Sequence, residues 1–361
     1  MRNTFGSSIS VTLFGESHGQ MTGAVLDGIA PGTQIDYEYI RRKLFLRSPH
    51  SDISTPRREK DEFSIVSGVR NGFAEGTPIT ILIPNSNTKS GDYAKTQYLA
   101  RPGHADYTAE CKYNGFQDAS GGGHFSGRIT AALVAAGAIC SHALEEKSIF
   151  VGTHIKKLGG VCDCEFSEDR LFEEVRMLSN CEFPVIDDKK GDEMQRRILE
   201  AKQNLDSVGG ILETAVCGVP AGLGEPWFDT CESVLSHILF SIPAIKGVEF
   251  GLGFGFADKT GSQVNDCMRS IDGEVTHTSN NNGGILGGIT NGMPIIFRTA
   301  VKPTPSIARP QNTVDIKTHQ NAVIEIKGRH DPCIAHRAAF VVNAAASIAV
   351  YDLLKQLIIN N

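Results

Sequence analysis

The sequence has no surplus of positive charge, because 35 Lys and Arg residues stand against 41 Asp and Glu residues and give a formal net charge of -6. A protein that binds duplex nucleic acid mainly by neutralising phosphates is expected to carry a basic surplus. The composition therefore argues against a nucleic-acid partner. Any anion site has to be a local arrangement of cations.

The sequence also lacks an apolar run of the roughly 18 residues that a membrane span needs, and its first residues lack the apolar core of a signal peptide. Its nine cysteines are scattered, without a disulfide framework. These features predict a cytoplasmic protein with reduced thiols and no membrane contact. Cys162 and Cys164, with His154 upstream, are the nearest metal-like group, but one short pair indicates a polar loop, so no metal is expected.

The chain is instead rich in glycine, with 38 residues. Its composition, 40% hydrophobic and 21% charged, is that of a globular protein. No linker or low-complexity segment divides it, so residues 1–361 are predicted to form one domain. The charged segment 167–195 is interpreted as a solvated excursion.

Short β-branched runs bounded by Gly, Pro or Asn predict strands, and they lie at residues 11–14, 79–83, 295–297 and 323–326. Two apolar segments, at residues 128–144 and 333–357, are typical of helices buried within a protein. Ordinary amphipathic helices are predicted at residues 194–205 and 227–240.

One pattern occurs twice. Residues 72–81 read GFAEGTPITI and residues 288–297 read GITNGMPIIF, in each case a glycine turn followed by proline at a strand start. The similarity is either chance or the trace of two related halves that share one core.

Two polar loops carry a histidine. Residues 15–19 (GESHG) follow a predicted strand, and His18 there is suited to proton transfer near neutral pH. Taken alone, this loop is better interpreted as a surface turn, because a single histidine in a loop is common. In residues 101–106 (RPGHAD), Arg101 is suited to binding an anion and Asp106 to orienting His104, although a turn closed by Asp106 fits as well.

Residues 119–128 (ASGGGHFSGR) lead into the first buried helix. Glycines before a helix N-terminus offer unpaired N–H groups and the positive end of the helix dipole, which favour an anion. Neither a Walker sequence nor a dinucleotide fingerprint is present. We interpret this loop as an anion or ligand loop.

Two loops in the C-terminal part complete the set. Residues 302–306 (KPTPS) place a charge and two hydroxyls in a proline-stiffened loop, which suits a phosphate but also a plain structural loop. Asp331, after Arg329 and before Pro332, is either a helix N-cap or part of a site.

In this order and spacing, the loops resemble chorismate synthase over nearly the whole chain, together with residues 206–210 (DSVGG), 243–249 (PAIKGVE) and 283–288. The resemblance implies a lyase that eliminates phosphate from 5-enolpyruvylshikimate 3-phosphate in an anti-1,4 sense. Reduced FMN is required without net redox change, and NADPH is a possible reductant. It also implies an α+β layered sandwich with buried helices between antiparallel sheets, assembled as a homotetramer.

The resemblance assigns roles to residues. His18 is implied as the acid that assists the leaving phosphate, His104 as the group that manages flavin protonation, and Asp331 as a proton-handling group near the flavin. It implies anion contacts to the substrate from Arg47, Arg101 and Arg128. The implied flavin contacts are His124, Phe125, Ser126, Gly287, Lys302, Pro303, Thr304, Pro305, Ser306 and Arg329.

The sequence departs from the family in the ligand loops. His124, Phe125 and Ile129 replace the usual Arg, Ser and Glu, and Asp52 lies near a usual Arg position. Fewer cations are expected to weaken binding of a trianion, since each charge-assisted hydrogen bond contributes about 1.5 to 3 kcal/mol. A diverged flavin-binding homologue with altered or lost elimination is the alternative. A purely structural protein is disfavoured, because it gives no reason for His18, His104 and Asp331 to occur together with three glycine-rich loops.

Overall fold

The structure is a computed structural model, and it describes residues 3–55, 61–86, 98–326 and 331–360. Its first sheet has five antiparallel strands in the order β1-β2-β3-β7-β4. The strands are β1 (Thr4–Phe5), β2 (Ser10–Gly15), β3 (Met21–Asp27), β4 (Ser64–Ser67) and β7 (Ile79–Pro84). The predicted strands at residues 11–14 and 79–83 lie within β2 and β7.

The second sheet also has five antiparallel strands, in the order β11-β16-β10-β8-β9. Its strands are β8 (Phe150–Leu158), β9 (Val161–Cys162), β10 (Gly210–Cys217), β11 (Ile245–Phe250) and β16 (Ile295–Val301). The predicted strand at residues 295–297 is the start of β16.

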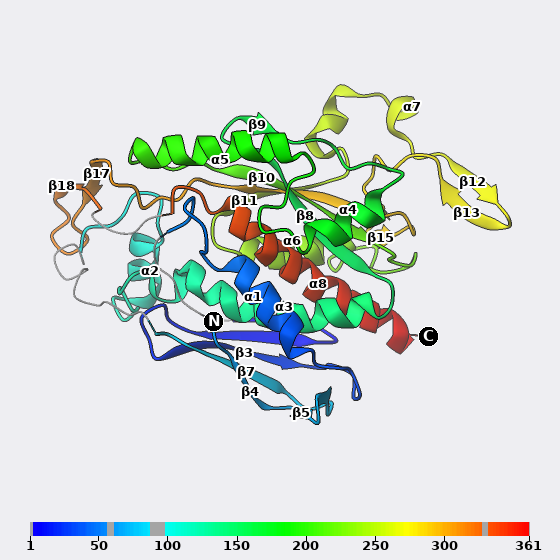
Figure 1. The fold of residues 1–361 in the computed structure, drawn as a ribbon, viewed down its shortest axis with the longest axis horizontal. Coiled ribbons are helices and arrows are strands. Elements are labelled where there is room, and N and C mark those ends of the chain that lie inside the picture. Colours follow the sequence, from blue (N-terminus) through cyan, green and yellow to red (C-terminus); the bar gives the residue numbers. More distant parts are fainter. Residues whose placement is uncertain (1–2, 56–60, 87–97, 327–330, 361) are drawn as a thin grey trace.

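Helices fill the space between the two sheets (Figure 1). They are α1 (Tyr37–Arg47), α3 (Thr130–Glu145), α6 (Cys231–Ser241) and α8 (Ala335–Asn360). The helices α3 and α8 approach closely at Gly137, where a Cβ atom would lie 2.5 Å from the Cβ of Ala344. This arrangement confirms the predicted α+β layered sandwich.

Both long helices are apolar enough to cross a membrane by length and composition, but they are 83% and 94% buried inside the protein. They are the core helices of the sandwich. Among the residues packed between them and the sheets are Ala136, Ile139, Val342 and Ile348, all 2% exposed or less. The predicted burial of both segments is therefore confirmed.

The strand topology repeats between the two halves of the chain. A short hairpin precedes β7, formed by β5 (Val69–Arg70) and β6 (Phe73–Ala74), and another precedes β16, formed by β14 (Ile285–Leu286) and β15 (Ile289–Thr290). β7 pairs between β3 and β4, and β16 pairs between β10 and β11. The chain then leads from β7 to α3 and from β16 to α8. The shared topology supports two related halves.

The remaining elements lie around this frame. They are α2 (Asp106–Tyr113), η2 (Gly123–Phe125), η3 (Gly127–Ile129), α4 (Leu171–Leu178), α5 (Asp188–Gln203), η4 (Gly253–Asp258), α7 (Gly261–Val264), β12 (Met268–Ile271), β13 (Glu274–His277), β17 (Gln311–Val314) and β18 (Asn321–Ile324).

The interpretation of residues 167–195 as a solvated excursion is wrong. The segment contains α4 and the start of α5, and its apolar residues Val175, Leu178 and Met194 are fully buried. Val175 packs against Ala215 and Cys217 of β10. The high charge of the segment belongs to its solvent face, while a sparse apolar set covers the sheet.

Several predicted boundaries also shift. The helix α5 begins at Asp188, before the predicted residue 194, and α6 begins at Cys231 because Thr230 caps it. The strand β18 ends at Ile324. The helix α8 begins at Ala335 instead of residue 333, and the carbonyl of Pro332 is bound by the N–H group of Val208 at 2.9 Å.

Candidate active site

A cavity of about 990 Å³ lies where the two long connections of the fold meet. One connection leads from β7 to α3 and supplies residues such as His104 and Ser126, and the other leads from β16 to α8 and supplies Lys302 and Asp331. These connections occupy equivalent positions in the two halves. The one cavity is therefore lined by equivalent connections of both halves, which contribute different side chains.

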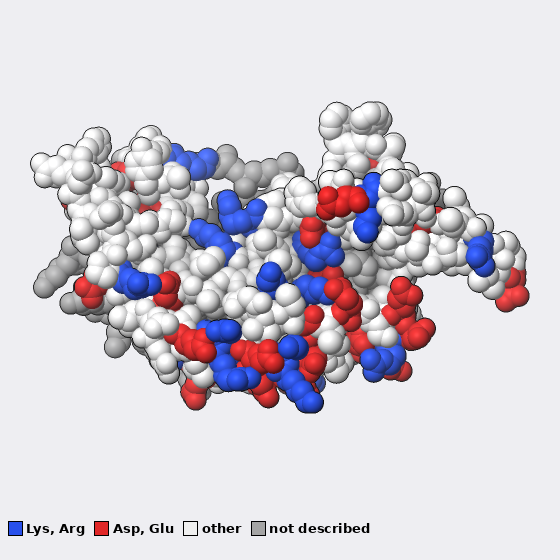
Figure 2. Space-filling model, turned by 90° about the horizontal axis from the view of Figure 1, so that it is seen from above, with Lys and Arg blue, Asp and Glu red and all other residues white. Residues whose placement is uncertain are grey.

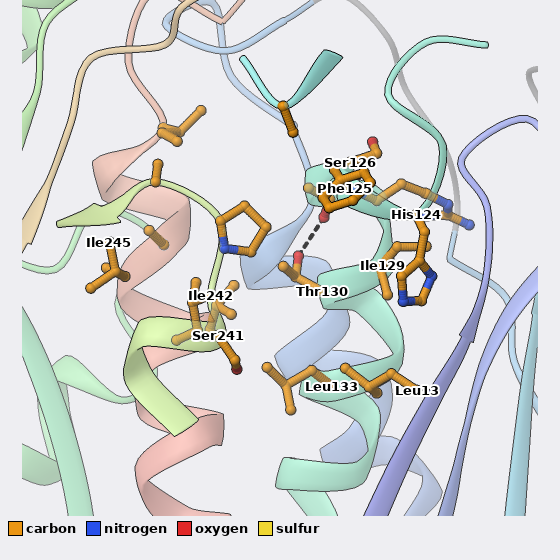
Figure 3. Close-up of a pocket in the computed structure, with 18 of the residues that line it drawn as sticks. Leu13, His124, Phe125, Ser126, Ile129, Thr130, Leu133, Ser241, Ile242 and Ile245 are labelled. Atoms are coloured by element: carbon orange, nitrogen blue, oxygen red, sulfur yellow. Dashed lines mark hydrogen bonds between the residues drawn. The ribbon is translucent and has the colours of Figure 1, made fainter. Parts of the chain in front are cut away.

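One wall of the cavity is apolar. Figure 3 shows Leu133 from α3 facing Ile242 and Ile245, which follow α6, with Leu13 and Ile129 beside them. The opposite side is polar. In Figure 2, Lys and Arg side chains gather around a hollow in one face of the protein, whereas acidic and basic side chains are mixed along the edge. A cavity with an apolar wall and a few convergent polar groups is typical of small-molecule sites.

The structure brings most of the predicted site residues to this cavity. Those that line it are Arg47, Arg101, His104, His124, Phe125, Ser126, Arg128, Lys302, Thr304, Pro305, Ser306 and Asp331. His18 and Pro303 lie next to lining residues but do not line the cavity themselves. Arg329 lies outside the described residues.

Gly287 is not brought to the cavity. It lies in the turn between β14 and β15, where the N–H group of Cys231, the first residue of α6, donates to the carbonyl of Gly288 at 2.8 Å. The cavity instead contacts the other end of α6. The flavin contact implied for Gly287 stays a prediction.

His18 sits behind the glycine loop. Its ring lies so close to Gly121 that a Cβ atom there would be 2.1 Å from its Cε1, and Gly121 itself lines the cavity. The hydroxyl of Ser17 donates to the carbonyl of Ser120 at 3.2 Å and lies 3.0 Å from Nδ1 of His18. Since the one hydroxyl hydrogen is used, the oxygen accepts from Nδ1 of His18, which orients the ring.

His104 is oriented by Asp106, as the sequence predicts. Nδ1 of His104 donates to Oδ1 of Asp106 at 2.7 Å. Burial raises the pKa of Asp106, but the hydrogen bonds from Arg101 and His104 outweigh it and hold that pKa well below its usual range. The Asp106 carboxylate thus stays ionised and fixes Nε2 of His104 as the proton-exchanging atom.

The guanidinium group of Arg101 makes several hydrogen bonds within the protein. It donates from Nη2 and Nε to the two oxygens of Asp106, at 2.6 and 2.8 Å, and from Nη1 to the carbonyl of Gly121 at 3.0 Å. It therefore joins the His104 turn to the glycine loop. Its role as an anion contact stays a prediction.

Arg47 and Arg128 share a carboxylate that the motifs did not reveal. Nη2 of Arg47 lies 2.6 Å from Oδ2 of Asp61, and Nη1 of Arg128 donates to Oδ1. Burial alone raises the pKa of Asp61, but the two guanidinium groups reverse this and lower it. Burial also lowers the pKa of Arg47. The three groups form a buried unit with one net positive charge.

Asp331 is not a helix N-cap, because α8 begins four residues later. Its Oδ1 accepts from the N–H group of Thr55 at 2.7 Å, and its Oδ2 accepts from Arg337. Arg337 also lines the cavity, and its Nε is buried with no partner among the described residues. The N-cap alternative is therefore wrong, and Asp331 is a charged group at the cavity wall.

The loop that begins at Lys302 is held against the His104 turn. The ammonium group of Lys302 donates to the carbonyl of Gly103, and the hydroxyl of Ser207 donates to the carbonyl of Thr304 at 2.7 Å. The side-chain oxygen of Thr304 is buried with no partner among the described residues. Because a buried hydroxyl without a partner is costly, this atom is suited to a bound ligand.

The departures from the family pattern have structural consequences. Nδ1 of His124 lies 2.8 Å from the carbonyl of Gly15 and so ties the glycine loop to the end of β2. Ile129 is 6% exposed and joins the apolar wall. Asp52 is exposed and does not line the cavity. The loss of the family's Arg and Glu is thus accommodated by one backbone contact and one apolar contact.

Asp61 and Arg337 are among the charged residues of the cavity region that were not predicted from the sequence. Asp61 stands in a charged stretch with no motif, and Arg337 stands in the first turn of an otherwise apolar helix. The one signal for Arg337 is a charge within a segment that is predicted to be buried. Such a residue needs a partner or a ligand.

Comparison with known proteins places the whole chain in one family. A family model described as chorismate synthase matches residues 9–354. The chorismate synthase of Aeropyrum pernix is 43% identical over 98% of this chain and 93% of its own length, and that of Thermococcus gammatolerans is 44% identical over 97% and 96%. The chorismate synthase of Dehalococcoides mccartyi is 43% identical over 98% and 96%.

A solved structure supports the same assignment. A crystal structure of chorismate synthase aligns with a TM-score of 0.77 at 30% identity, covering 98% of this chain and 93% of that one. Nothing in these matches favours a diverged homologue that has lost the elimination.

Proposed function

The chain belongs to the chorismate synthase family, and on that premise we propose how the residues around the cavity divide the work. The protein is a carbon-oxygen lyase that eliminates phosphate from 5-enolpyruvylshikimate 3-phosphate and yields chorismate, a step of the shikimate pathway towards aromatic amino acids. The observation that carries the assignment is one cavity with histidines, arginines and the Asp331 carboxylate on its polar side and an apolar wall on the other.

We propose that this cavity binds reduced FMN beside the substrate. A volume of about 990 Å³ lies at the upper end for small-molecule sites, which suits two ligands. The buried hydroxyl of Thr304, with no described partner, and the neighbouring Ser306 fit a phosphate or ring oxygen, with His124, Phe125 and Ser126 opposite. When bound, the reduced flavin supplies electron density as phosphate leaves and recovers it as the ring C–H bond breaks.

The substrate carries a phosphate and two carboxylates, so it needs cations. We propose that Arg47, Arg128 and Arg101 supply them from the cavity wall. Arg47 and Arg128 carry one net charge together with Asp61, and Lys302 adds another near the His104 turn. This local charge is what an acidic protein needs to bind a trianion.

We assign proton handling to three groups. His18 assists the departure of phosphate by giving a proton, and Ser17 orients its ring. His104 holds or exchanges a proton at Nε2, because Asp106 fixes Nδ1 as the donor. The Asp331 carboxylate helps to take up the ring proton, and each oxygen keeps a lone pair beyond its bond to Thr55 or Arg337.

We further propose that the enzyme is a cytoplasmic homotetramer of single-domain chains and that NADPH is a possible reductant for its flavin. Large apolar side chains on the surface support assembly, for Trp227, Phe228 and Phe254 are 76%, 92% and 87% exposed. One core cluster contains residues of both halves, which supports a single domain. Light scattering gives the mass of the assembly, and anaerobic oxidation of NADPH with added FMN tests the reductase activity.

The experiment that tests the proposal is an anaerobic assay of the purified protein with reduced FMN and 5-enolpyruvylshikimate 3-phosphate. We expect chorismate and phosphate in equal amounts, with no net oxidation of flavin. Product formation without added flavin, or no binding of either flavin form in the presence of substrate, would overturn the cofactor assignment.

A further inference from the structure

A single carboxylate lies behind two arginines of the cavity wall. Asp61 is 5% exposed and does not line the cavity, whereas Arg47 and Arg128 both do. Each oxygen of Asp61 accepts from a different arginine, Oδ2 from Nη2 of Arg47 at 2.6 Å and Oδ1 from Nη1 of Arg128. The carboxylate therefore joins the two cations from within the protein.

Both arginines also form hydrogen bonds with the adjoining helix and strand end. Nη1 of Arg47 donates to the hydroxyl of Thr130, the first residue of α3, at 3.1 Å. Nε of Arg128 donates to the side-chain oxygen of Asn85 at 2.9 Å, and Nη2 donates to the carbonyl of Pro84 at the end of β7 at 3.2 Å. The two guanidinium groups are thus held between a strand end and a helix start.

The charges explain why a carboxylate is needed there. Two buried guanidinium groups repel each other, and removal of Asp61 would take away the carboxylate that offsets this repulsion. Arg47 has no other acidic partner among the described residues. The two guanidinium groups and the Asp61 carboxylate together sum to one positive charge at the cavity wall.

We propose that Asp61 is a positioning residue for the elimination, which holds Arg47 and Arg128 side by side so that the anionic groups of the substrate meet a prearranged pair. The inference rests on the proposed function, in which both arginines contact the substrate. Asp61 acts through the arginines and has no contact with the reacting atoms. It sets substrate affinity rather than the rate of the chemical step.

The test is the variant Asp61→Asn. Asp61 has φ of 48°, in the left-handed region that Asn tolerates well, so the backbone can be retained. Asn has only one acceptor oxygen, and its NH₂ group faces the donors of the second arginine. We expect the dissociation constant of 5-enolpyruvylshikimate 3-phosphate, measured by calorimetry on flavin-free protein, to rise about 10- to 100-fold, the loss of one charge-assisted contact.

The kinetic readout separates positioning from a general structural role. We expect KM to rise in parallel, while kcat with reduced FMN changes less than about threefold, because only binding is affected. If Asp61→Asn does not fold, Asp61→Glu keeps the charge but displaces it by one methylene, and the same rise in the dissociation constant is expected. An unchanged dissociation constant in the folded variant overturns the inference. A tighter one also does so, because Asp61 would then compete with the substrate for the arginines.

Two further variants serve as controls. Arg128→Gln reports on the proposed function: if it leaves substrate affinity unchanged, the arginine contacts are wrong and the inference about Asp61 falls with them. If Arg128→Gln weakens binding but Asp61→Asn does not, only the inference about Asp61 is wrong. Asp352→Asn is the matched control, since Asp352 is 1% exposed, accepts from the N–H groups of Ser8 and Ile9, and lies away from the cavity. We expect it to lower the melting temperature and leave affinity unchanged.

Discussion

Two clusters of buried charge in this protein use the same residue types for different ends. Around the cavity, Asp61, Asp106 and Asp331 each bind an arginine at the wall of an open volume. In the second sheet, His154, Glu213, Arg298 and Glu249 lie directly opposite one another on β8, β10, β16 and β11. The first cluster faces a cavity, whereas the second spans the sheet, with His154 and Glu213 buried and Arg298 and Glu249 half-buried.

In the sheet cluster, the charged side chains are paired with one another. His154 is fully buried and contacts Asp163 with Nδ1 at 2.9 Å and Glu213 with Nε2 at 3.0 Å. Arg298 then binds Glu213 at 3.2 Å and Glu249 at 2.6 Å. Because donors and acceptors match within the sheet, we expect changes there to alter stability, whereas changes at the cavity should alter rate or affinity.

The largest expected effect is on rate. His18→Ala and His104→Ala should each lower turnover about 100- to 10,000-fold, as expected for loss of a general acid or base. Both residues lie in loops outside the core, so the melting temperature should change little. Stopped-flow measurement of chorismate formation checks this. Near-native turnover in either variant returns that histidine to a structural role.

Asp331→Asn should slow the elimination about 100-fold while substrate and flavin affinity stay within a few-fold of wild type. The N-cap explanation no longer applies, and Asn can still accept from the N–H group of Thr55. What it loses is the basic oxygen that takes up a proton. The single-turnover rate and the dissociation constants, measured on one preparation, distinguish these roles. An unchanged rate rejects the catalytic role of Asp331. A large loss of affinity makes Asp331 a binding residue.

Glu213→Gln probes the other cluster. Removal of one charged partner from a buried network costs about 3 to 5 kcal/mol, so the free energy of unfolding should fall by that order. In the fraction of protein that remains folded, kcat/KM should equal that of wild type. Urea unfolding and an active-site titration of the same sample measure both quantities. A changed kcat/KM would show that the sheet cluster is coupled to the cavity.

The smallest effect is on the pH dependence of stability. Burial lowers the pKa of His154, but hydrogen bonds to Asp163 and Glu213 outweigh it and raise the pKa above the ordinary value. A raised folded-state pKa gives stability that is complete below the unfolded value of about 6.5 and is lost as pH rises through the folded value. Lys156, 3.6 Å from Glu213, and the ring of Phe166 also face this group.

Urea unfolding of wild type and His154→Gln across pH 6 to 9 isolates this contribution. We expect the difference in free energy of unfolding between the two proteins to shrink as pH rises. A difference that is constant or grows with pH would mean that His154 is neutral in the folded protein.

The comparison also shows what a sequence can reveal. Loops with a polar motif, such as those at His18, His104 and Lys302, could be recognised because glycine and proline mark them locally. Apolar helices could be recognised because the α3 and α8 segments have no polar face. Asp61 could not, since its importance comes from contacts with Arg47 and Arg128, which are 14 and 67 residues away.

The same reason explains the errors. The charged segment 167–195 was interpreted from its surface residues, and only the contact of Val175 with β10 shows that it covers the sheet. The start of α8 likewise depends on a tertiary hydrogen bond, from the N–H group of Val208 to the carbonyl of Pro332. Such a contact cannot be predicted from the local sequence.

The most direct test of the account compares one variant from each cluster in the same two measurements. Asp106→Asn and Glu213→Gln each remove a negative charge that binds both a histidine and an arginine, half-buried in the first case and buried in the second. The single-turnover rate of chorismate formation, normalised to folded protein, should fall strongly for Asp106→Asn and stay at the wild-type value for Glu213→Gln, whose free energy of unfolding falls instead. Equal rate losses in the two variants would contradict the division between a catalytic cavity and a structural sheet cluster.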